Sequence, residues 1–172
     1  MSEAGLIIDA VEGLTVSQGP MAGQPVRLAK FQKKFVEGAF ADGVNIACLS
    51  VGRGNGKTAV SAALAVTHLL GQWDAQPQRE VVVAARTRDQ AATCFNFCRS
   101  FIGDRADVKV RRGASLEIEF EDGTGPHLLK AVASTGKGVL GGAATLAILD
   151  ERAAWMTSRG AEMEAALLTS LG

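Results

Sequence analysis

One segment of this 172-residue chain restricts its fold more than any other, because it joins two apolar stretches through a glycine-rich turn. The order is an apolar run over residues 45–51, the turn G-R-G-N-G-K-T over 52–58, and a stretch over 58–70 that is apolar nearly all round. A continuous apolar run is typical of a strand covered on both faces of a parallel sheet, and a helix without a polar face is a buried one. The segment therefore predicts a buried strand, a tight turn and a buried helix.

The rest of the chain continues this alternation of strands and helices. We expect further helices over residues 28–40, 87–103 and 160–171, and further strands over 80–85, 116–120, 127–133 and 145–149. The strict alternation at 116–120 and the turn residues after it predict an antiparallel hairpin. The pattern as a whole predicts an α/β fold with a mainly parallel sheet flanked by helices. Residues 1–26 lack a steady period and are interpreted as an extended lead-in to one domain over 27–172.

Composition narrows the class of protein. Cations and acids number 18 each, and 47% of residues are apolar, which excludes a uniformly basic nucleic-acid coat and a disordered chain. The zero net charge is a sum of blocks, positive over 27–58 and 79–112 and negative over 113–172. The three cysteines lack metal-ligand spacing and are interpreted as small buried hydrophobes: Cys48, Cys94 and Cys98. The longest uncharged run, 58–73, is shorter than the roughly 18–20 residues that span a bilayer, so we expect no membrane contact.

The turn at 52–58 has the composition of a phosphate-binding loop. Its glycines allow backbone N–H groups to close around a polyphosphate, and the N-terminus of the following helix adds unpaired donors and a positive dipole. In such a loop Lys57 reaches the β- and γ-phosphates and the Thr58 hydroxyl binds Mg²⁺. The usual spacing places a glycine where this chain has Val51, one residue before Gly52. A glycine-rich turn that ends in Lys-Thr by coincidence is the alternative interpretation.

A pair of acids follows the apolar run L-A-I-L at residues 146–149. Carboxylates at the carboxyl end of a parallel strand lie on the ligand side of an α/β sheet. Asp150 is then suited to the Mg²⁺ water shell, and Glu151 to orienting or deprotonating an attacking water. Surface acids are the alternative, but the combination with a phosphate loop favours the functional interpretation.

Three runs together resemble a known family. V-G-R-G-N-G-K-T, V-V-V-A-A-R-T-R-D-Q-A and L-A-I-L-D-E-R-A-A-W are similar to the N-terminal ATPase domain of the large terminase subunit of tailed phages, the motor that packages DNA into procapsids. The resemblance covers roughly residues 27–172 and implies a P-loop NTPase fold, ATP and Mg²⁺ as cofactors, and ATP hydrolysis. The family's loop variant, R-x-N-G-K-[ST], also accounts for Val51.

The resemblance implies roles for individual residues. The nucleotide-binding set would be Gln32, Gly52, Arg53, Gly54, Asn55, Gly56, Lys57 and Thr58. Thr58 and Asp150 would bind Mg²⁺, and Glu151 would be the catalytic acid, assisted by Lys57 and by Arg53 near the γ-phosphate. Gln32 would lie beside the adenine, although by itself it is only a polar residue on an amphipathic helix. Residues 84–92 match a further family motif, which a capping box of Thr87 and Gln90 explains without a ligand.

The same resemblance implies partners and a cellular setting. These are double-stranded DNA, the procapsid portal, the small terminase subunit, and further copies of the chain in a ring, all in the cytoplasm of an infected bacterium. Such motors use an arginine from a neighbouring subunit; Lys137 stands where one is expected, and Arg111 and Arg112 are other candidates. We expect the chain to be C-terminally incomplete relative to the family, without a nuclease domain.

Other functions remain open at this point. A helicase-like translocase is suggested by D-E-R-A, although the R-G-N-G-K-T loop argues against it. A truncated module that binds nucleotide without turnover is a third possibility. A cationic run could contact DNA phosphates or form a solvated face: Arg99, Arg105, Lys109, Arg111 and Arg112.

Overall fold

A single mixed sheet flanked by helices forms the centre of the computed structural model, which describes residues 2–17, 19–133, 143–151 and 158–171. The strands are β1 (Glu80–Ala85), β2 (Val108–Arg112), β3 (Leu116–Glu121), β4 (Pro126–Ala133) and β5 (Leu146–Leu149). The helices are α1 (Glu3–Glu12), α2 (Lys30–Ala39), α3 (Lys57–Leu69), α4 (Arg88–Ile102) and α5 (Ser158–Ser170). The predicted α/β class is confirmed.

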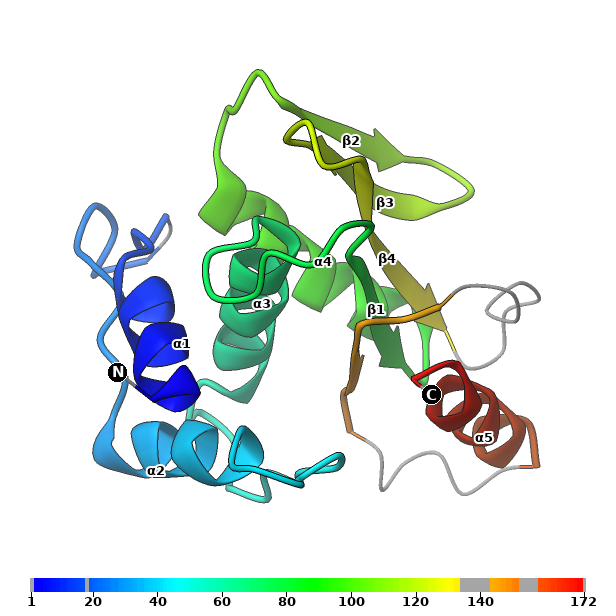
Figure 1. Cartoon of the computed structure of the whole chain (residues 1–172), viewed down its shortest axis with the longest axis horizontal. Helices are drawn as coiled ribbons and strands as arrows, with labels where there is room; N and C mark the ends of the chain where they lie inside the picture. The colour runs from blue at the N-terminus through cyan, green and yellow to red at the C-terminus, as the bar shows by residue number, and fades with distance from the viewer. Residues whose placement is uncertain (1, 18, 134–142, 152–157, 172) are drawn as a thin grey trace.

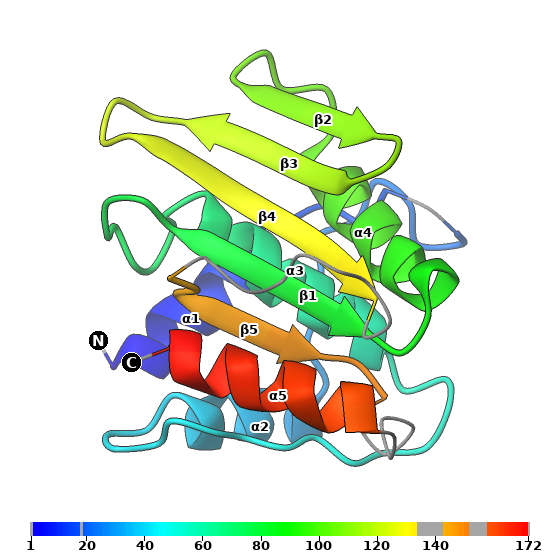
Figure 2. The same ribbon diagram turned by 90° about the vertical axis from the view of Figure 1, so that its right-hand side faces the viewer.

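The sheet has the order β2-β3-β4-β1-β5 (Figure 2). β1 pairs in parallel with both β4 and β5, whereas β3 pairs antiparallel with β2 and β4. The antiparallel part is therefore larger than the one predicted hairpin, because β2 extends it. Four of the five residues of β2 are exposed, so this edge strand lacks the apolar alternation by which a strand is recognised from sequence.

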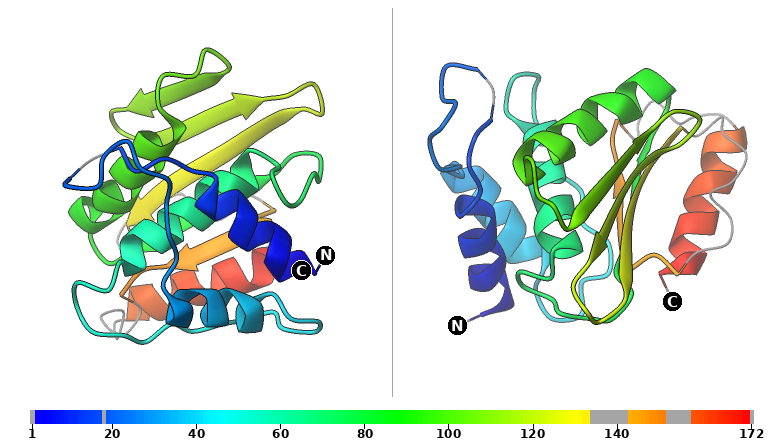
Figure 3. Two further views of the ribbon diagram at one scale, coloured as in Figure 1. Left: turned by 90° about the vertical axis from the view of Figure 1, so that its left-hand side faces the viewer. Right: turned by 90° about the horizontal axis from the view of Figure 1, so that it is seen from above.

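The helices form layers on both sides of the sheet (Figures 1 and 3). α3 and α4 cover one face, where one large apolar cluster joins them to β1, β3 and β4. α5 covers the opposite face through Met163 and Leu167, which pack with Val82 and Ala84 of β1. α1 and α2 pack on the outer side of α3. The loop that leads into α3 lies next to α2, because the Gln32 side chain of α2 donates to the Asn55 carbonyl of the loop.

The prediction of a buried strand over residues 45–51 is wrong. This segment has no assigned strand, and most of it is exposed, including Ile46 at 69% and Cys48. The expectation that Cys48 is buried fails with it, whereas Cys94 and Cys98 are buried as predicted. Strand formation requires main-chain hydrogen bonds from a neighbour, and no strand among the described residues pairs with this segment. An apolar run alone does not supply that neighbour.

The prediction that residues 1–26 are an extended lead-in is also wrong for their first part. Residues 3–12 form α1, which buries Ala4, Ile7 and Val11 at helical spacing. The Ser2 hydroxyl caps the helix by accepting a hydrogen bond from the Gly5 N–H at 3.2 Å. The spacing of these apolar residues was a detectable signal. α1 is thus part of the main apolar core.

The end of α1 is tied to α2 by an ion pair. Glu12 accepts hydrogen bonds from the Lys33 ammonium at 2.9 Å and from the Leu28 N–H at 2.9 Å. The bond from Lys33 is the main reason why the pKa of Glu12 lies below its ordinary value. This contact places α2, and Gln32 on it, against the start of α3.

Candidate active site

The glycine-rich loop makes a tight turn directly before α3. Gly54 and Gly56 have φ values of 80° and 71°, in the left-handed region that favours glycine, and Gly56 is the N-cap of α3. The Lys57 ammonium folds back over the loop and donates to the carbonyls of Val51 at 2.7 Å and Gly52 at 3.2 Å. The loop therefore holds its cation beside unpaired helix N–H groups, which is the arrangement that anions bind.

Two amide side chains fix the shape of this loop. Asn55 donates across the turn to the Gly52 carbonyl at 3.2 Å. Gln32, only 8% exposed, donates to the Asn55 carbonyl at 3.1 Å and accepts from the Ala29 N–H at 2.8 Å, at the start of α2. Ala29 has no side-chain acceptor, so only the glutamine half of a capping box is formed there. Gln32 thus connects α2 to the loop, a role that the sequence pattern did not reveal.

The acid pair lies at the carboxyl end of β5. The Asp150 N–H donates to the Ala84 carbonyl at 2.8 Å, which continues the pairing of β5 with β1 by one residue. Burial is the main cause that raises the pKa of Asp150, followed by the neighbouring Glu151 carboxylate. The Lys57 ammonium lowers the same pKa, so the loop and the end of β5 lie within electrostatic range of each other.

Glu151 is exposed and adopts a φ of 49°, which is uncommon for a residue other than glycine. Its carboxylate oxygen Oε2 accepts a hydrogen bond from the Gln90 side-chain amide at 2.8 Å. Gln90 belongs to the predicted capping box of α4, which the structure confirms together with Thr87. Its contact with Glu151 is a second role that capping alone did not predict.

These residues fit a magnesium nucleotide. Mg²⁺ prefers oxygen ligands, keeps several waters and takes one or two carboxylates plus substrate phosphates. The half-buried Thr58 on α3 and Asp150 at the end of β5 supply such oxygens beside the Lys57 charge. Over the part of the chain that the structure describes, there is no cluster of three or more metal-binding side chains. Phosphate and water oxygens would therefore have to complete the coordination.

The other residues predicted for the site are Arg53 and the candidates for a trans-acting cation. Arg53 is exposed on the loop, and its carbonyl lies 3.5 Å from the Asn55 amide. Among the candidates for a trans-acting cation, Arg111 pairs with Glu119 at 2.8 Å, and Arg112 donates to Asn96 at 2.8 Å. Lys137 lies outside the described residues.

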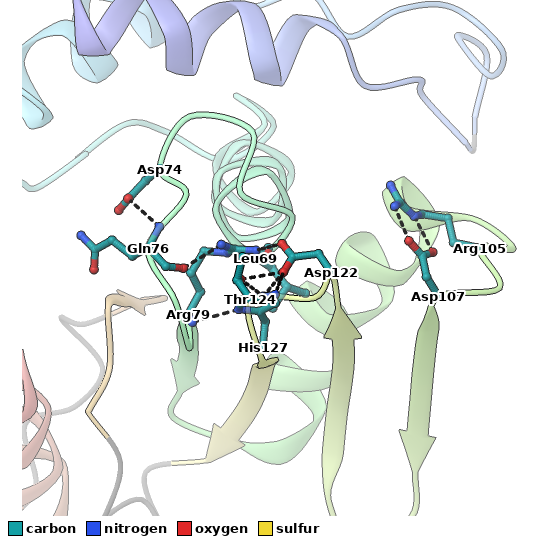
Figure 4. A network of polar contacts seen from close by, with 9 residues as sticks. All are labelled: Leu69, Asp74, Gln76, Arg79, Arg105, Asp107, Asp122, Thr124 and His127. Carbon is teal, nitrogen blue, oxygen red and sulfur yellow. Dashed lines mark hydrogen bonds and ion pairs between the residues drawn. The ribbon is translucent and has the colours of Figure 1, made fainter.

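A second polar cluster lies at the opposite end of the strands (Figure 4). The buried Arg79 guanidinium donates to the Leu69 carbonyl at 3.0 Å, to the Gln76 carbonyl at 2.7 Å and to Asp122 at 2.7 Å. Asp122 also contacts His127 at 2.8 Å and accepts from the Thr124 hydroxyl at 2.6 Å. These bonds, led by that of Thr124, place the pKa of Asp122 far below its ordinary range. Every member has an internal partner, so the cluster ties the end of α3 to β1 and β4.

Nearby residues of the predicted cationic run also have local partners. Arg105 forms a two-pronged ion pair with Asp107, at 2.9 and 2.6 Å (Figure 4). Its guanidinium also lies over the Phe120 ring. The bond to Asp107 is the main cause that raises the pKa of Arg105. Local pairing of Arg105, Arg111 and Arg112 favours a solvated face over a DNA-binding surface there. No helix of the described residues is long and apolar enough to cross a membrane.

A glycine-rich loop opening a helix, with an acid pair at the end of a nearby parallel strand, defines a nucleotide-binding domain of the P-loop class. The family model described as terminase large subunit, ATPase domain, matches residues 30–171. The chain therefore belongs to the family of terminase large subunit ATPase domains, and the predicted resemblance is confirmed.

Two relatives from one phage illustrate the similarity. The large terminase subunit of Enterobacteria phage HK97 is 33% identical over 146 residues, which cover 79% of this chain and 27% of that protein. The crystal structure of the HK97 bacteriophage large terminase matches with a TM-score of 0.81 at 27% identity, covering 100% of this chain and 36% of that one. The chain thus spans well under half the length of these relatives, and the comparisons do not favour a helicase-like translocase.

Proposed function

We propose that this chain hydrolyses ATP as part of a motor that packages phage DNA. The observation that carries the proposal is the pairing of a glycine-rich loop, over which the Lys57 ammonium folds at the start of α3, with an acid pair at the carboxyl end of the parallel strand β5. The effect of the Lys57 charge on the pKa of Asp150 supports a common site. Membership of the terminase ATPase family supports the same reaction. Turnover, and not only nucleotide binding, is proposed because the site includes a second acid, Glu151, next to the first.

The loop residues would bind the triphosphate. Backbone N–H groups from Gly52 to Thr58 would surround the phosphates, with the Lys57 charge placed against the β- and γ-phosphates. Arg53 extends from the same loop and would lie near the γ-phosphate. Gln32 would support binding through the Asn55 carbonyl, because its two amide atoms already connect α2 to the loop.

The acid pair would divide two tasks. Asp150 and the Thr58 hydroxyl would hold Mg²⁺, which when bound neutralises charge on the phosphate oxygens. Glu151 would accept the proton of a water whose oxygen attacks the γ-phosphorus in line. The bond from that phosphorus to the β–γ bridging oxygen breaks, and the products are ADP and inorganic phosphate. Catalysis would come mainly from positioning and charge stabilisation.

The wider assignment extends this reaction to its biological setting. We infer that double-stranded DNA, a procapsid portal and a small terminase subunit are the partners, in a ring of several copies within the host cytoplasm. This inference rests on membership of the family. The chain matches only 27% of the length of its HK97 relative, so the partners of the whole protein are proposed for it and not observed. In that setting hydrolysis would drive DNA translocation.

Phosphate release from ATP with Mg²⁺ tests the reaction. We expect turnover by the wild-type chain, and a loss of about 10²- to 10⁴-fold in Glu151→Gln, because a positioned general base contributes roughly that factor. The isosteric change should leave binding of a fluorescent ADP analogue intact, which distinguishes lost chemistry from lost binding. A Glu151→Gln chain that hydrolyses ATP at the wild-type rate would refute the mechanism, and binding without turnover in the wild type would favour a nucleotide-binding module.

A further inference from the structure

The start of α4 and the end of β5 meet through one side chain. Gln90, the third residue of α4, uses its Oε1 to accept from the Thr87 N–H at 3.1 Å. Its own N–H donates to the Thr87 hydroxyl at 3.3 Å, which completes the capping box. The Nε2 atom of the same amide donates to Glu151 Oε2 at 2.8 Å. One side chain therefore caps a helix and binds the acid assigned to catalysis.

The capping box determines which end of the amide faces Glu151. The Thr87 N–H is a donor and requires an acceptor, so Oε1 of Gln90 must point toward it. Nε2, which can only donate, is then directed to the carboxylate. A flipped amide would lose the cap bond and place oxygen against oxygen. Local helix capping thus fixes the donor for a group 61 residues away.

The sheet holds both ends of this contact in register. β1 leads into the Thr87 turn, and β5 leads into the acid pair, while Val83 lies opposite Ile148 and Ala84 opposite Leu149 in parallel pairing. The two strands therefore end at the same edge of the sheet, as Figure 2 shows. Gln90 lies in the first turn of α4 and Glu151 two residues after β5, so their approach follows from the pairing of β1 with β5.

We propose that Gln90 is a positioning residue that orients the Glu151 carboxylate for catalysis. Glu151 is exposed, and its side chain has several rotatable bonds, so without a partner it would sample many rotamers. The bond to Oε2 selects one of these and leaves Oε1 to accept the proton of an attacking water. This assignment rests on the proposed function, in which Glu151 is the general base.

Two matched substitutions separate positioning from capping. Gln90→Glu keeps the acceptor for the Thr87 N–H, because glutamate is a usual partner in a capping box, but it removes the donor and sets two carboxylates against each other. Thr87→Ala removes the hydroxyl cap but keeps the Gln90 donor and its bond to the backbone N–H. The first substitution removes the donor to Glu151 and keeps the acceptor of the cap, whereas the second removes the hydroxyl of the cap and keeps the donor to Glu151.

We expect opposite outcomes for the two variants. Gln90→Glu should lower kcat about tenfold or more, the factor associated with a hydrogen bond to a charged group, with KM for ATP unchanged and with a loss of urea midpoint no larger than that of Thr87→Ala. Thr87→Ala should lower the urea midpoint and keep kcat. The proposal is wrong, and Gln90 acts only as a cap, if Gln90→Glu retains the wild-type kcat. The same holds if the loss of kcat in both variants is proportional to their loss of urea midpoint.

The contact is also measurable without turnover. Urea unfolding of Gln90→Ala, Glu151→Ala and the double variant should give non-additive midpoints, because each single change breaks the same bond. Additive midpoints would overturn the contact itself. A wild-type chain without ATP hydrolysis would instead refute the proposed function and the catalytic role of Gln90, while the unfolding cycle still decides whether the two side chains interact.

Discussion

Protonation of a buried histidine should make the folded chain less stable in mild acid. His68, on the last turn of α3, is 1% exposed, and its Nε2 lies 2.8 Å from the Thr145 hydroxyl. Because that hydroxyl donates to the Glu80 carbonyl at 3.1 Å, Nε2 carries the ring proton and donates to it. The other ring nitrogen, Nδ1, has no hydrogen-bond partner among the described residues, since Asp74 Oδ2 is 3.9 Å away. A second ring proton would therefore be poorly accommodated.

The size of the effect follows from the pKa difference. Burial is the main cause that lowers the pKa of His68 from 6.5 to about 4, with Asp74 opposing the shift and Arg79 adding to it. The unfolded chain consequently binds more protons than the folded chain between these values, so stability is complete above about pH 6.5 and is lost as the pH falls toward 4. Between pH 7.5 and pH 5 the linkage amounts to about 2 kcal/mol of unfolding free energy.

Urea unfolding at these two pH values measures the loss. His68→Gln is the control, because its amide keeps a donor for the Thr145 hydroxyl but does not titrate. The wild type should lose about 2 kcal/mol more than this variant between pH 7.5 and pH 5. All other titratable groups are shared, so the difference between the two proteins isolates His68. Equal pH dependence in both proteins would refute the argument that burial excludes the second proton.

Three further substitutions test the loop and the second polar cluster. Gly71→Ala should lower the free energy of unfolding by about 1–2 kcal/mol in an Arg79→Met background, because Gly71 has a φ of 66°. In the wild type the loss should be at least about 1 kcal/mol larger, because the new Cβ would lie 2.9 Å from the hydrogen-bonded Arg79 guanidinium; equal losses in urea unfolding of both backgrounds would contradict this. Lys57→Ala should weaken binding of a fluorescent ADP analogue by about 10- to 100-fold, as expected for a lost charged contact, and unchanged affinity would remove Lys57 from the site. Gln32→Glu keeps the acceptor for Ala29 but loses the donor to Asn55, so it should lower stability by about 1 kcal/mol and nucleotide affinity several-fold; loss of affinity without loss of stability would instead indicate direct contact with the nucleotide.

The elements that sequence predicted correctly are those with strong local signals. The apolar runs of β1 and β5, the glycine-rich turn and the apolar helix α3 lie where the pattern placed them. The capping box of α4 was also correct, because its two partners are three residues apart and interact within one turn. Such features depend on neighbours in the chain, which a sequence displays directly.

The errors concern partners that are distant in the chain. Residues 45–51 have the composition of a buried strand, yet composition does not determine whether another strand lies beside them. β2 was missed for the converse reason, since pairing with β3 makes it a strand although its side chains are exposed. The contact between Gln90 and Glu151 required knowing that β1 and β5 are adjacent. The sequence identified both residues but not their interaction.

The geometry of the site depends on how a very short strand is held. β5 has four residues at the edge of the sheet, so the position of Glu151 relies on contacts at both of its ends. At its start, the Thr145 hydroxyl contacts Glu80 and His68; at its end, Asp150 pairs with β1 and Glu151 with Gln90. His68 lies near the end of α3, the helix that begins at the glycine-rich loop. α3 is therefore tied to β5 at the end remote from the site, so the helix that begins at the loop also contacts the strand that carries the acid pair.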